Sequence, residues 1–521
     1  MKRFTKSFDS LKEQFMETTE LDKKFSKEIL SEIQKNAKDN FAKDKKREDF
    51  RHLRIVCIDP DGARDHDDAI SVEDIKDGYI LGVHIADVSH FVRPGSELDK
   101  EAQKRGYTQY LPWIAVPMLP EILSADLCSL RENEDRFSFS CIMTLDKKFK
   151  VRKYRFAKGL IKVNHSITYG QAVELFEKKD KNICLLARIA AGLKKNRNES
   201  GILELDSTEY QCQFNKKGEP LRIIPRVSDA SNSWIEECML AANKCCALEL
   251  QKRKLNGIYR VHDAPDPQDV TELMNSEPNL FSDSPINPSK LLKSYSGANS
   301  QEARIFELYL HLVKKAKGNS VLTNKILRSM QKAQYSEKCS GHFALHWKDY
   351  AHFTSPIRRY ADLWCHRELS SKKGNSQLSA ITSQLNEAEI INQKIERKAL
   401  KLCVSYLLQD RIGEVFNAEI QGVEEFGIFI SISDKIVAMA DGLVHMRDIP
   451  GDFYVHDEIK KVLIGKRTGK RFKRGDKVTV KLIKVNPVKG ENDFEIIQQR
   501  NKDEATGKKN PWKKRERRFG R

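Results

Sequence analysis

The sequence predicts an α+β protein in which a large mixed domain is followed by a small five-stranded β-barrel and a basic tail. The chain has 521 residues, more than the roughly 250–300 at which a single hydrophobic core stops growing, so several domains are expected. Short β-branched runs and amphipathic helical stretches alternate through most of the chain. Near its C-terminal end, short strand-like runs separated by glycine are typical of a small barrel.

The composition indicates a soluble globular protein, with 39% hydrophobic and 32% charged residues. No apolar run approaches the roughly 18 residues that span a bilayer. The basic N-terminus also lacks the apolar segment of a signal peptide, so we expect no membrane contact and a cytoplasmic location. The 11 cysteines are odd in number, irregularly spaced and without a C-x-x-C pair. We therefore expect reduced thiols, with neither disulfides nor zinc.

The charge balance favours a polyanionic partner. The formal net charge is +18 and the isoelectric point is near 9.2. Each lysine or arginine that neutralises a phosphate releases a condensed counterion, so nucleic acid is the leading candidate. The alternative is a protein that is basic without any nucleic-acid role.

Two regions are expected before the barrel. Residues 1–45 are predicted to be a helical N-terminal lead-in, because apolar residues recur at helical spacing among lysines and glutamates. The large domain is expected over residues 46–370, and its predicted elements are strands at 54–59 (RIVCID), 69–73 (AISVE) and 79–92 (YILGVHIADVSHFV) and an amphipathic helix at 233–252.

The remaining chain divides into three predicted segments. Residues 371–410 are expected to be a helical connector that completes the large domain, with its helix at 376–408. Residues 411–498 carry the glycine-punctuated strands of the barrel. Residues 499–521 are expected to form a disordered basic tail, since residues 500–521 hold ten lysines or arginines against three acids.

A cluster of aspartates carries the strongest chemical signal. The segment VCIDPDGARDHDDAISVE places five aspartates within ten residues, and Pro60 and Gly62 argue against a helix between its strand-like flanks. Carboxylates this close repel one another when partly buried, and a bound dication removes that cost. Carboxylate oxygens suit Mg²⁺ or Mn²⁺, and two such ions about 4 Å apart can activate water and stabilise the leaving oxygen of a phosphodiester.

Three other interpretations compete. A solvated acidic turn does not explain why the cluster interrupts two apolar strands. An EF-hand loop starting at Asp59 fails, because its fifth and sixth positions are Ala63 and Arg64. His66 and Asp67 match the HD pair of a helical phosphohydrolase, with His84 or His90 as a further ligand, but the flanking strands disfavour a site of that kind.

The segment IDPDGARDHDDA resembles the signature of the RNase II/RNase R (RNB) family of exoribonucleases, and RNase R is the more similar type. The resemblance extends over roughly residues 30–498. Further segments agree in order and spacing: GVHIADVSHFVRPGSELDKEA (82–102), YLPWIAVPMLPEILSADLCSL (110–130), IEECMLAAN (235–243), YRVHD (259–263) and GHFALHWKDYAHFTSPIRRYADLWCHR (341–367). The resemblance implies an RNB catalytic domain followed by an S1-like OB-fold domain.

The resemblance also implies a catalytic site. Arg358 matches the family arginine that lies against the scissile phosphate, where a guanidinium would offset developing charge. An ordinary phosphate contact or a structural ion pair is the alternative for Arg358, and is favoured more for Arg359, which we include among the RNA contacts. The implied ligands of two Mg²⁺ ions, for which Mn²⁺ is a substitute, are Asp59, Asp65, Asp67 and Asp68, with Asp67 most directly tied to hydrolysis.

Other family positions imply contacts to RNA. Tyr110 matches an aromatic residue that stacks on a base, with a buried core tyrosine as the alternative. Tyr169 and Glu236 match positions near the terminal ribose, where a hydroxyl-reading site distinguishes RNA from DNA. Leu205 stands where the family has a second stacking aromatic, so the base clamp departs from the family pattern.

The barrel resembles the OB-fold repeated in the largest small-subunit ribosomal protein. Phe426, Phe429 and His445 stand where such folds present rings to single-stranded RNA, with a core role as the alternative for each. RNase R-type proteins also carry two cold-shock-like domains before the catalytic domain, and only about 50 residues precede Leu53 here. We therefore expect either a short family member or an incomplete chain.

The expected function is processive 3′→5′ hydrolysis of single-stranded RNA to nucleoside 5′-monophosphates, with two divalent ions, an activated water and Arg358. The family resemblance implies a monomer, and we consider ribosomes or a helicase as further partners. An inactive family member that only binds RNA is the alternative, although every acidic position of the motif is present. An HD phosphohydrolase, which would favour transition metals, is the third.

Overall fold

The computed structural model describes residues 7–36, 46–205, 208–226, 229–281, 298–370, 378–458 and 460–497. The predicted tail, the first part of the predicted connector and the end of the lead-in lie outside these residues. The chain divides into a larger unit, residues 16–209 and 225–399, and a smaller unit, residues 1–15, 210–224 and 400–521. No helix in the described ranges combines the length and the apolar character needed to cross a membrane.

The larger unit is built on a seven-stranded sheet with the strand order β1-β8-β7-β4-β3-β2-β9. Neighbouring strands are antiparallel except at its two edges, where β1 pairs with β8 and β2 pairs with β9 in parallel. The strands are β1 (Glu48–Asp49), β2 (Ile55–Asp59), β3 (Asp68–Ile75), β4 (Gly78–Ala86), β7 (Asp135–Asp146), β8 (Val151–Lys162) and β9 (His165–Thr168), with a separate two-stranded sheet of β5 (Gln109–Leu111) and β6 (Ile114–Val116).

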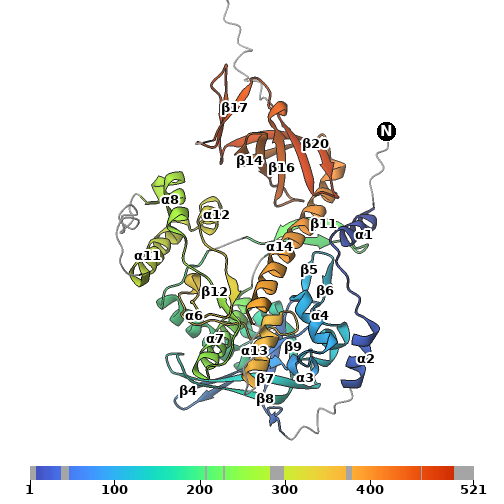
Figure 1. Ribbon diagram of the computed structural model, residues 1–521, viewed down its shortest axis with the longest axis vertical. Helices are drawn as coiled ribbons and strands as arrows, with labels where there is room; N and C mark the ends of the chain where they lie inside the picture. The colour runs from blue at the N-terminus through green and yellow to red at the C-terminus, as the bar shows by residue number, and fades with distance from the viewer. Residues whose placement is uncertain are drawn as a thin grey trace, which may run out of the picture. The chain divides into compact units, whose positions relative to one another are not determined.

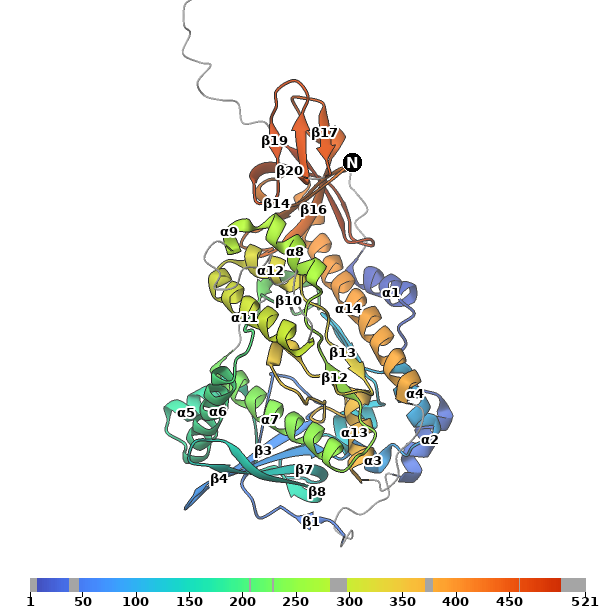
Figure 2. The same cartoon turned by 60° about the vertical axis from the view of Figure 1, so that its left-hand side comes forward.

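Residues on both faces of β2 are buried in hydrophobic cores, as the continuous apolar run in this strand requires. Ile55 and Cys57 point to one face and join a core with residues of α2 (Lys27–Asn36) and α4 (Glu97–Arg105). Val56 and Ile58 join a second core with residues of α5 (Tyr169–Glu177), α6 (Lys181–Glu199) and α7 (Ala230–Lys252). Figure 2 shows α7 and α13 (Tyr360–Ser370) above β3, β4, β7 and β8. The β2–β3 connection therefore begins at the end of a strand that is buried on both faces.

The helices of the larger unit confirm the predicted amphipathic segments at 233–252 and 376–408, the second from residue 378 onward. A further core is formed by α8, α9, α11 and α12. The helices are α2 (Lys27–Asn36), α3 (Val88–Phe91), α4 (Glu97–Arg105), α5 (Tyr169–Glu177), α6 (Lys181–Glu199), α7 (Ala230–Lys252), α8 (Pro267–Ser276), α9 (Pro278–Phe281), α11 (Ala298–Ala316), α12 (Ser320–Arg328), α13 (Tyr360–Ser370) and α14 (Leu378–Leu408), which continues into the smaller unit; β12 (Tyr259–Val261) pairs with β13 (Gln334–Ser336).

One predicted strand is shorter than expected. The run at 79–92 is extended only to Ala86, and a single helical turn, α3, follows. The chain turns at Asp87, whose buried carboxylate lies 2.7 Å from the Arg47 guanidinium and 3.1 Å from the Lys158 amine. Asp87 is oriented toward these two cations and does not continue the strand. The turn thus coincides with tertiary ion pairs, which the local sequence pattern does not reveal.

The smaller unit contains a closed five-stranded barrel, β14-β15-β16-β21-β20 (Figure 1), which confirms the predicted fold class. The barrel strands are β14 (Val415–Glu424), β15 (Gly427–Ile432), β16 (Ala440–His445), β20 (Lys477–Asn486) and β21 (Glu491–Ile496). A three-stranded sheet of β17 (Tyr454–Asp457), β18 (Val462–Gly465) and β19 (Arg471–Phe472) is inserted between β16 and β20.

Two segments from earlier in the chain, residues 1–15 and 210–224, also belong to the smaller unit. The domain boundaries expected from the sequence are continuous in the chain and do not include these segments. Phe8 of α1 (Phe8–Thr18) lies 5.1 Å from Tyr406 and 6.1 Å from Phe214, measured between ring centroids. The hairpin of β10 (Tyr210–Phe214) and β11 (Pro220–Pro225) is tied to the barrel because Ile223 N–H donates to the carbonyl of Ile436 at 2.8 Å.

Candidate active site

The aspartate cluster lies in the loop between β2 and β3, as its sequence pattern predicts. Asp59 ends β2 and Asp68 begins β3. The hydroxyl of Ser129 fixes this loop, because it accepts from His66 N–H at 3.1 Å and donates to the carbonyl of Arg64 at 2.8 Å. The loop backbone is thus attached to a neighbouring segment of the same unit.

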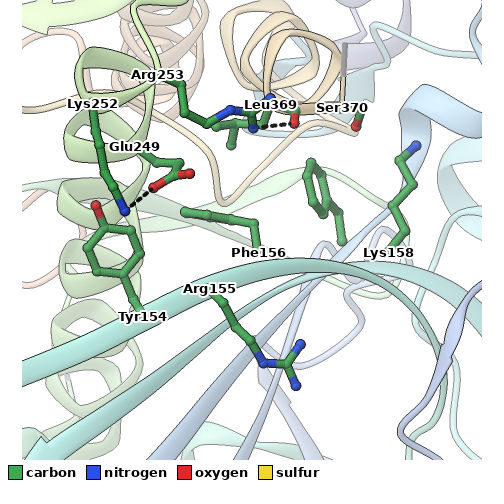
Figure 3. Close-up of a pocket in the computed structure, with 10 residues that line it drawn as sticks. Tyr154, Arg155, Phe156, Lys158, Glu249, Lys252, Arg253, Leu369 and Ser370 are labelled. Atoms are coloured by element: carbon green, nitrogen blue, oxygen red, sulfur yellow. Dashed lines mark hydrogen bonds and ion pairs between the residues drawn. The ribbon is translucent and has the colours of Figure 1, made fainter. Parts of the chain in front are cut away.

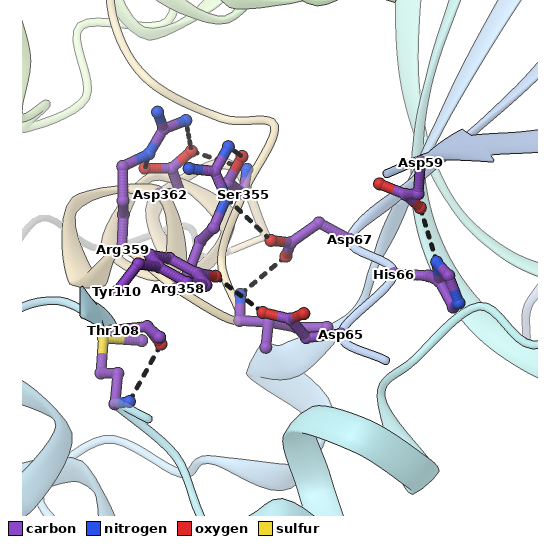
Figure 4. A network of polar contacts seen from close by, with 12 residues as sticks. Asp59, Asp65, His66, Asp67, Thr108, Tyr110, Ser355, Arg358, Arg359 and Asp362 are labelled. Carbon is purple, nitrogen blue, oxygen red and sulfur yellow. Dashed lines mark hydrogen bonds and ion pairs between the residues drawn. The ribbon is translucent and has the colours of Figure 1, made fainter. Parts of the chain in front are cut away.

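Asp67 joins this loop to the segment that precedes α13 (Figure 4). Its side chain is 4% exposed, and one oxygen, Oδ1, accepts from Ile357 N–H at 2.8 Å. The other oxygen, Oδ2, lies 3.5 Å from Arg358 Nε and forms no hydrogen bond. Burial raises the pKa of Asp67 well above its usual range, and the Arg358 charge opposes that rise. A buried carboxylate oxygen is therefore available beside an arginine.

The two neighbouring arginines of the SPIRRY segment have different environments. The Arg358 side chain is 43% exposed, and its Nη2 donates to Ser355 Oγ at 2.8 Å. The Arg359 guanidinium instead forms two hydrogen bonds with buried Asp362, at 2.8 and 2.7 Å. Asp362 also accepts from Ser355 N–H at 2.8 Å. The geometry of Arg359 corresponds to a structural ion pair, the alternative to an RNA contact for this residue.

Tyr110 lies on β5 next to the arginine segment. The adjacent backbone is attached there, since Thr108 N–H donates to the carbonyl of Arg358 at 3.0 Å. The Tyr110 hydroxyl donates to Asp65 Oδ2 at 2.7 Å, and the residue is 44% exposed. Burial of the hydroxyl and the nearby Asp65 carboxylate raise the pKa of Tyr110. The structure therefore does not place this tyrosine in the core.

Two substitutions of Tyr110 should distinguish the contribution of its ring to RNA binding from that of its hydroxyl. Tyr110→Ala should weaken the binding of single-stranded RNA about fivefold or more, the low end of the cost of losing one stacking contact. Tyr110→Phe should keep RNA affinity within about twofold, since the ring's π-face remains available. Fluorescence anisotropy in EDTA measures both constants without hydrolysis. Equal losses in the two variants would assign the effect to the hydroxyl and exclude stacking.

Asp59 is surrounded by a histidine and a cysteine. His66 Nδ1 lies 2.5 Å from Asp59 Oδ2, and the Cys57 thiol donates to the same oxygen at 3.0 Å. The hydrogen bond between His66 and Asp59 raises the pKa of His66. Burial, with Asp59 nearby, raises the pKa of the Cys57 thiol, so the sulfur stays protonated and is a poor metal ligand. In the described ranges, Cys57, Asp59 and His66 are the one group of three potential metal ligands whose ligand atoms all lie within 4.8 Å of one another.

The donor chemistry of the loop fits a hard divalent cation. Burial and the neighbouring Asp59 raise the pKa of Asp68 to about 7, and Asp67 Oδ2 has no hydrogen-bond partner. The neighbouring cations do not fully offset the burial of these two carboxylates, and Mg²⁺ or Mn²⁺ would supply further positive charge through oxygen ligands. The four aspartates do not form one compact cage, because Asp65 is hydrogen bonded to Tyr110 and Asp59 to His66.

The geometry gives no support to His84 or His90 as the further ligand of an HD site. His84 is fully buried in β4, and its two ring nitrogens lie 2.9 Å from Ser71 Oγ and 2.8 Å from Ser140 Oγ. Neither nitrogen is left for a metal. His90 lies 3.3 Å from an Arg47 nitrogen, and its ring contacts that of Phe137. The two histidines that an HD site would need in addition to His66 therefore have other partners.

The burial of His84 should make stability depend on pH. Burial lowers its pKa to about 3, whereas an unfolded histidine titrates near 6.5. As pH falls below 6.5 the unfolded chain binds a proton that the folded chain does not, so stability is lost. His84→Gln should reduce the fall in unfolding free energy between pH 7 and pH 5 by about 2 kcal/mol. Urea denaturation at both pH values measures this difference. An unchanged fall would contradict it, and the same substitution at exposed His165 is the control.

Three further predicted residues of the larger unit differ in their surroundings. Tyr169 begins α5, and burial together with Asp68 and Asp59 raises its pKa to about 12, which indicates that its hydroxyl lies near the loop. Glu236 is exposed on α7. Leu205 is partly buried against the core formed by α8, α9, α11 and α12, so no aromatic ring occupies that position.

Two of the three predicted residues of the barrel present exposed rings, and His445 is partly exposed. Phe426 is 54% exposed and Phe429 is 40% exposed, and their ring centroids lie 5.8 Å apart. His445 is near them because it pairs with Gly427 between β15 and β16. The exposure of both phenylalanines favours surface stacking over a core role.

Sequence reasoning did not identify Ser355 and Asp362 as part of this site. Both act on the arginine segment, through the contacts of Ser355 with Arg358 and of Asp362 with Arg359. The only local signal is the three-residue spacing between Arg359 and Asp362 at the start of α13, which is typical of an ion pair on a helix.

A hollow of the larger unit, about 510 Å³ in volume, is lined by none of the predicted site residues (Figure 3). It is lined by residues of β7, β8, α7 and α13. Its cations have partners within the protein: Lys158 pairs with Asp87, and Arg253 donates to the carbonyl of Leu369 at 2.8 Å. We therefore assign it no catalytic role.

Comparison with known proteins identifies the family. The RNB domain matches residues 47–373, more than half of the chain. The chain belongs to the RNB family. Its RNB domain contains both segments that meet at Asp67 and Ile357.

Relatives of this RNB protein include ribonucleases from several bacteria. Ribonuclease R of Aquifex aeolicus is 35% identical over 483 residues, which cover 88% of this chain and 66% of the relative. Ribonuclease R 2 of Lactococcus lactis is 32% identical over 505 residues, covering 91% of this chain and 73% of the relative. The chain thus spans roughly two thirds of the length of these relatives.

A solved structure supports the same relationship. The apo form of Mycoplasma genitalium RNase R is 27% identical and has a TM-score of 0.82, covering 94% of this chain and 78% of that one. The same protein has been solved in complex with ribose methylated single-stranded RNA and with double-stranded RNA.

Proposed function

We propose that this RNB protein is a metal-dependent 3′→5′ exoribonuclease. The observation that carries the proposal is the pairing of the aspartate loop with an arginine: Asp67 Oδ2 is buried, lacks a hydrogen bond and lies 3.5 Å from Arg358 Nε. Membership of the RNB family and similarity to two bacterial Ribonuclease R proteins support it. The finer proposal is processive release of nucleoside 5′-monophosphates with two ions.

The proposed substrate is single-stranded RNA. The net charge of +18 favours a polyanion. The Mycoplasma genitalium relative, solved with ribose methylated single-stranded RNA, supports this choice. The same relative, solved with double-stranded RNA, makes structured RNA a second substrate to test. We extend the proposal to a monomer in the cytoplasm, with ribosomes or a helicase as candidate partners.

The side chains divide the chemistry among them. Asp59, Asp65, Asp67 and Asp68 would hold the cations, which when bound supply an activated water and offset charge on the phosphate. Arg358 is exposed enough to contact the scissile phosphate, while its bond to Ser355 limits the orientations of the guanidinium. A fixed guanidinium can stabilise charge that develops on the phosphate without reorganising.

Tyr110 would place the terminal base. Its exposed ring lies beside Asp65, so a base stacked on the ring would bring its own phosphate toward the aspartate loop. Tyr169 and Glu236 would contact the terminal ribose, and hydrogen bonds to the 2′-hydroxyl would favour RNA over DNA.

The experiment is digestion of 5′-labelled single-stranded RNA in Mg²⁺, resolved at single-nucleotide length, with EDTA as the control. Stepwise shortening from the 3′ end to a short limit product supports the proposal. Internal cleavage would contradict the exonuclease assignment. Intact RNA that still binds would instead support the inactive RNA-binding alternative.

A further inference from the structure

The sheet inserted into the barrel has one buried face and one exposed face. Tyr454, Leu463 and Phe472 are at most 4% exposed and form the buried face. Strand β18 lies beside β14 of the barrel, so this face is covered within the unit. Side chains alternate along a strand, and the intervening residues must therefore point to the opposite face.

The opposite face carries apolar and basic side chains together. Phe453, directly before β17, is 68% exposed, and Val455 is 42% exposed. Strand pairing places Val455 opposite Ile464, and Ile464 opposite Arg471. Phe453 thus lies at the end of a row formed by Val455, Ile464 and Arg471. Exposure of its ring to water is unfavourable, and a ligand that covered the ring would gain hydrophobic free energy.

The local structure holds Phe453 in a fixed position. The carboxylate of Asp452 accepts from Phe453 N–H at 2.7 Å and from Thr468 N–H and Oγ1, both at 2.6 Å. Lys466 N–H donates to the carbonyl of Phe453 at 2.9 Å. The turn that follows β18 is thus tied to the start of β17, and a ligand binding there would pay little entropy to order the backbone.

The charge around the ring matches a nucleic acid. Residues 451–477 contain nine lysines or arginines and four acids. The Lys466 amine lies 5.1 Å from the centroid of the Phe453 ring. One of the four acids, Asp452, is occupied by the turn. An aromatic ring with cations beside it is the combination that binds single strands, because bases stack on the ring and phosphates contact the cations.

We propose that this face, formed by Phe453, Val455, Ile464, Lys466 and Arg471, is a second binding surface for single-stranded RNA. It shares no residue with the predicted surface of Phe426, Phe429 and His445. A protruding ring suits unpaired bases, since the bases of a duplex are already stacked on one another. The proposal rests on RNA as the ligand but not on hydrolysis.

The test measures binding of the full chain to fluorescent, unstructured RNAs of about 6 and about 30 nucleotides in EDTA, where no hydrolysis occurs. One OB-fold occupies about 4–16 nucleotides, so only the longer RNA can contact a second surface fully. We expect Phe453→Ala to weaken binding of the longer RNA about fivefold or more, and that of the shorter RNA less than about twofold. Phe453→Trp should restore affinity because it restores a stacking ring.

The cations should report on phosphate contacts. Lys466→Ala and Arg471→Ala should each reduce the slope of log affinity against log salt by about 0.7 for the longer RNA. Val488→Ala and Lys489→Ala are matched controls in the turn between β20 and β21, where both residues are exposed. These controls should leave both RNA affinities unchanged apart from a small unspecific charge effect.

Several results would overturn the proposal. Unchanged affinity of Phe453→Ala for the longer RNA excludes stacking and leaves the face to a protein partner. Equal losses for both RNA lengths would place Phe453 on the path to the active site. An equal loss for a duplex of the same length would exclude recognition of unpaired bases. The exoribonuclease proposal is tested separately, because its failure would appear as no hydrolysis of the shorter RNA in Mg²⁺.

Discussion

Asp67→Asn should lower the rate of RNA hydrolysis on the order of 10³-fold, because losing a metal ligand removes several kcal/mol of transition-state stabilisation. The substitution is nearly isosteric, and an asparagine Oδ1 can still accept from Ile357 N–H. The fold and RNA binding in EDTA should therefore be kept. Single-turnover hydrolysis in Mg²⁺ and anisotropy in EDTA measure the two effects separately.

The matched control is Asp61→Asn, an exposed aspartate of the same loop that is absent from the proposed ligand set. It changes the loop charge by the same amount, so a rate within a few-fold of wild type would show that position, rather than charge, matters. Turnover of the Asp67 variant at the wild-type rate would remove Asp67 from the proposed mechanism.

Arg358→Ala should lower kcat about 10²- to 10³-fold with a small change in KM, as expected when a group stabilises charge that develops in the transition state. The exposed guanidinium lies 3.5 Å from Asp67 Oδ2 and is oriented by Ser355. Arg358→Lys should recover only part of the rate, because a lysine keeps the charge but lacks the planar fork. Steady-state kinetics on a short RNA measures both variants.

The control is Arg188→Ala, which removes an equal charge from an exposed position on α6. A rise in KM alone for Arg358→Ala would assign this residue to ordinary phosphate binding. That result would favour the alternative kept from the sequence, and would leave the aspartate loop as the catalytic element.

The aspartate loop was predictable because its information is local. Asp59, Asp65, Asp67 and Asp68 lie within ten residues, and the flanking apolar runs identify the strands. The contact between this loop and the arginine segment was implied only by the family resemblance. It joins Asp67 to Ile357, which are 290 residues apart, and no local periodicity contains such a contact.

The parts of the site that sequence reasoning missed depend on tertiary structure. Ser355 is an ordinary polar residue in the sequence, and only the fold brings its hydroxyl to Arg358. The inserted sheet was missed because β17 and β18 have four residues each and β19 has two, too short to show a period. The mixed character of residues 451–477 therefore resembles a loop until strand pairing is known.

The way the barrel unit is assembled bears on how the protein is made. The Ile223 backbone is hydrogen bonded to Ile436 and Ala438, and Phe8 contacts Tyr406, so segments made early in translation complete their contacts only while the last quarter of the chain emerges. Until then the β10–β11 hairpin exposes an unpaired edge, a recognised template for aggregation. A ribosome that stalls before residue 436 would leave this edge open, and the long sequence separation of these contacts predicts slow folding of the C-terminal unit.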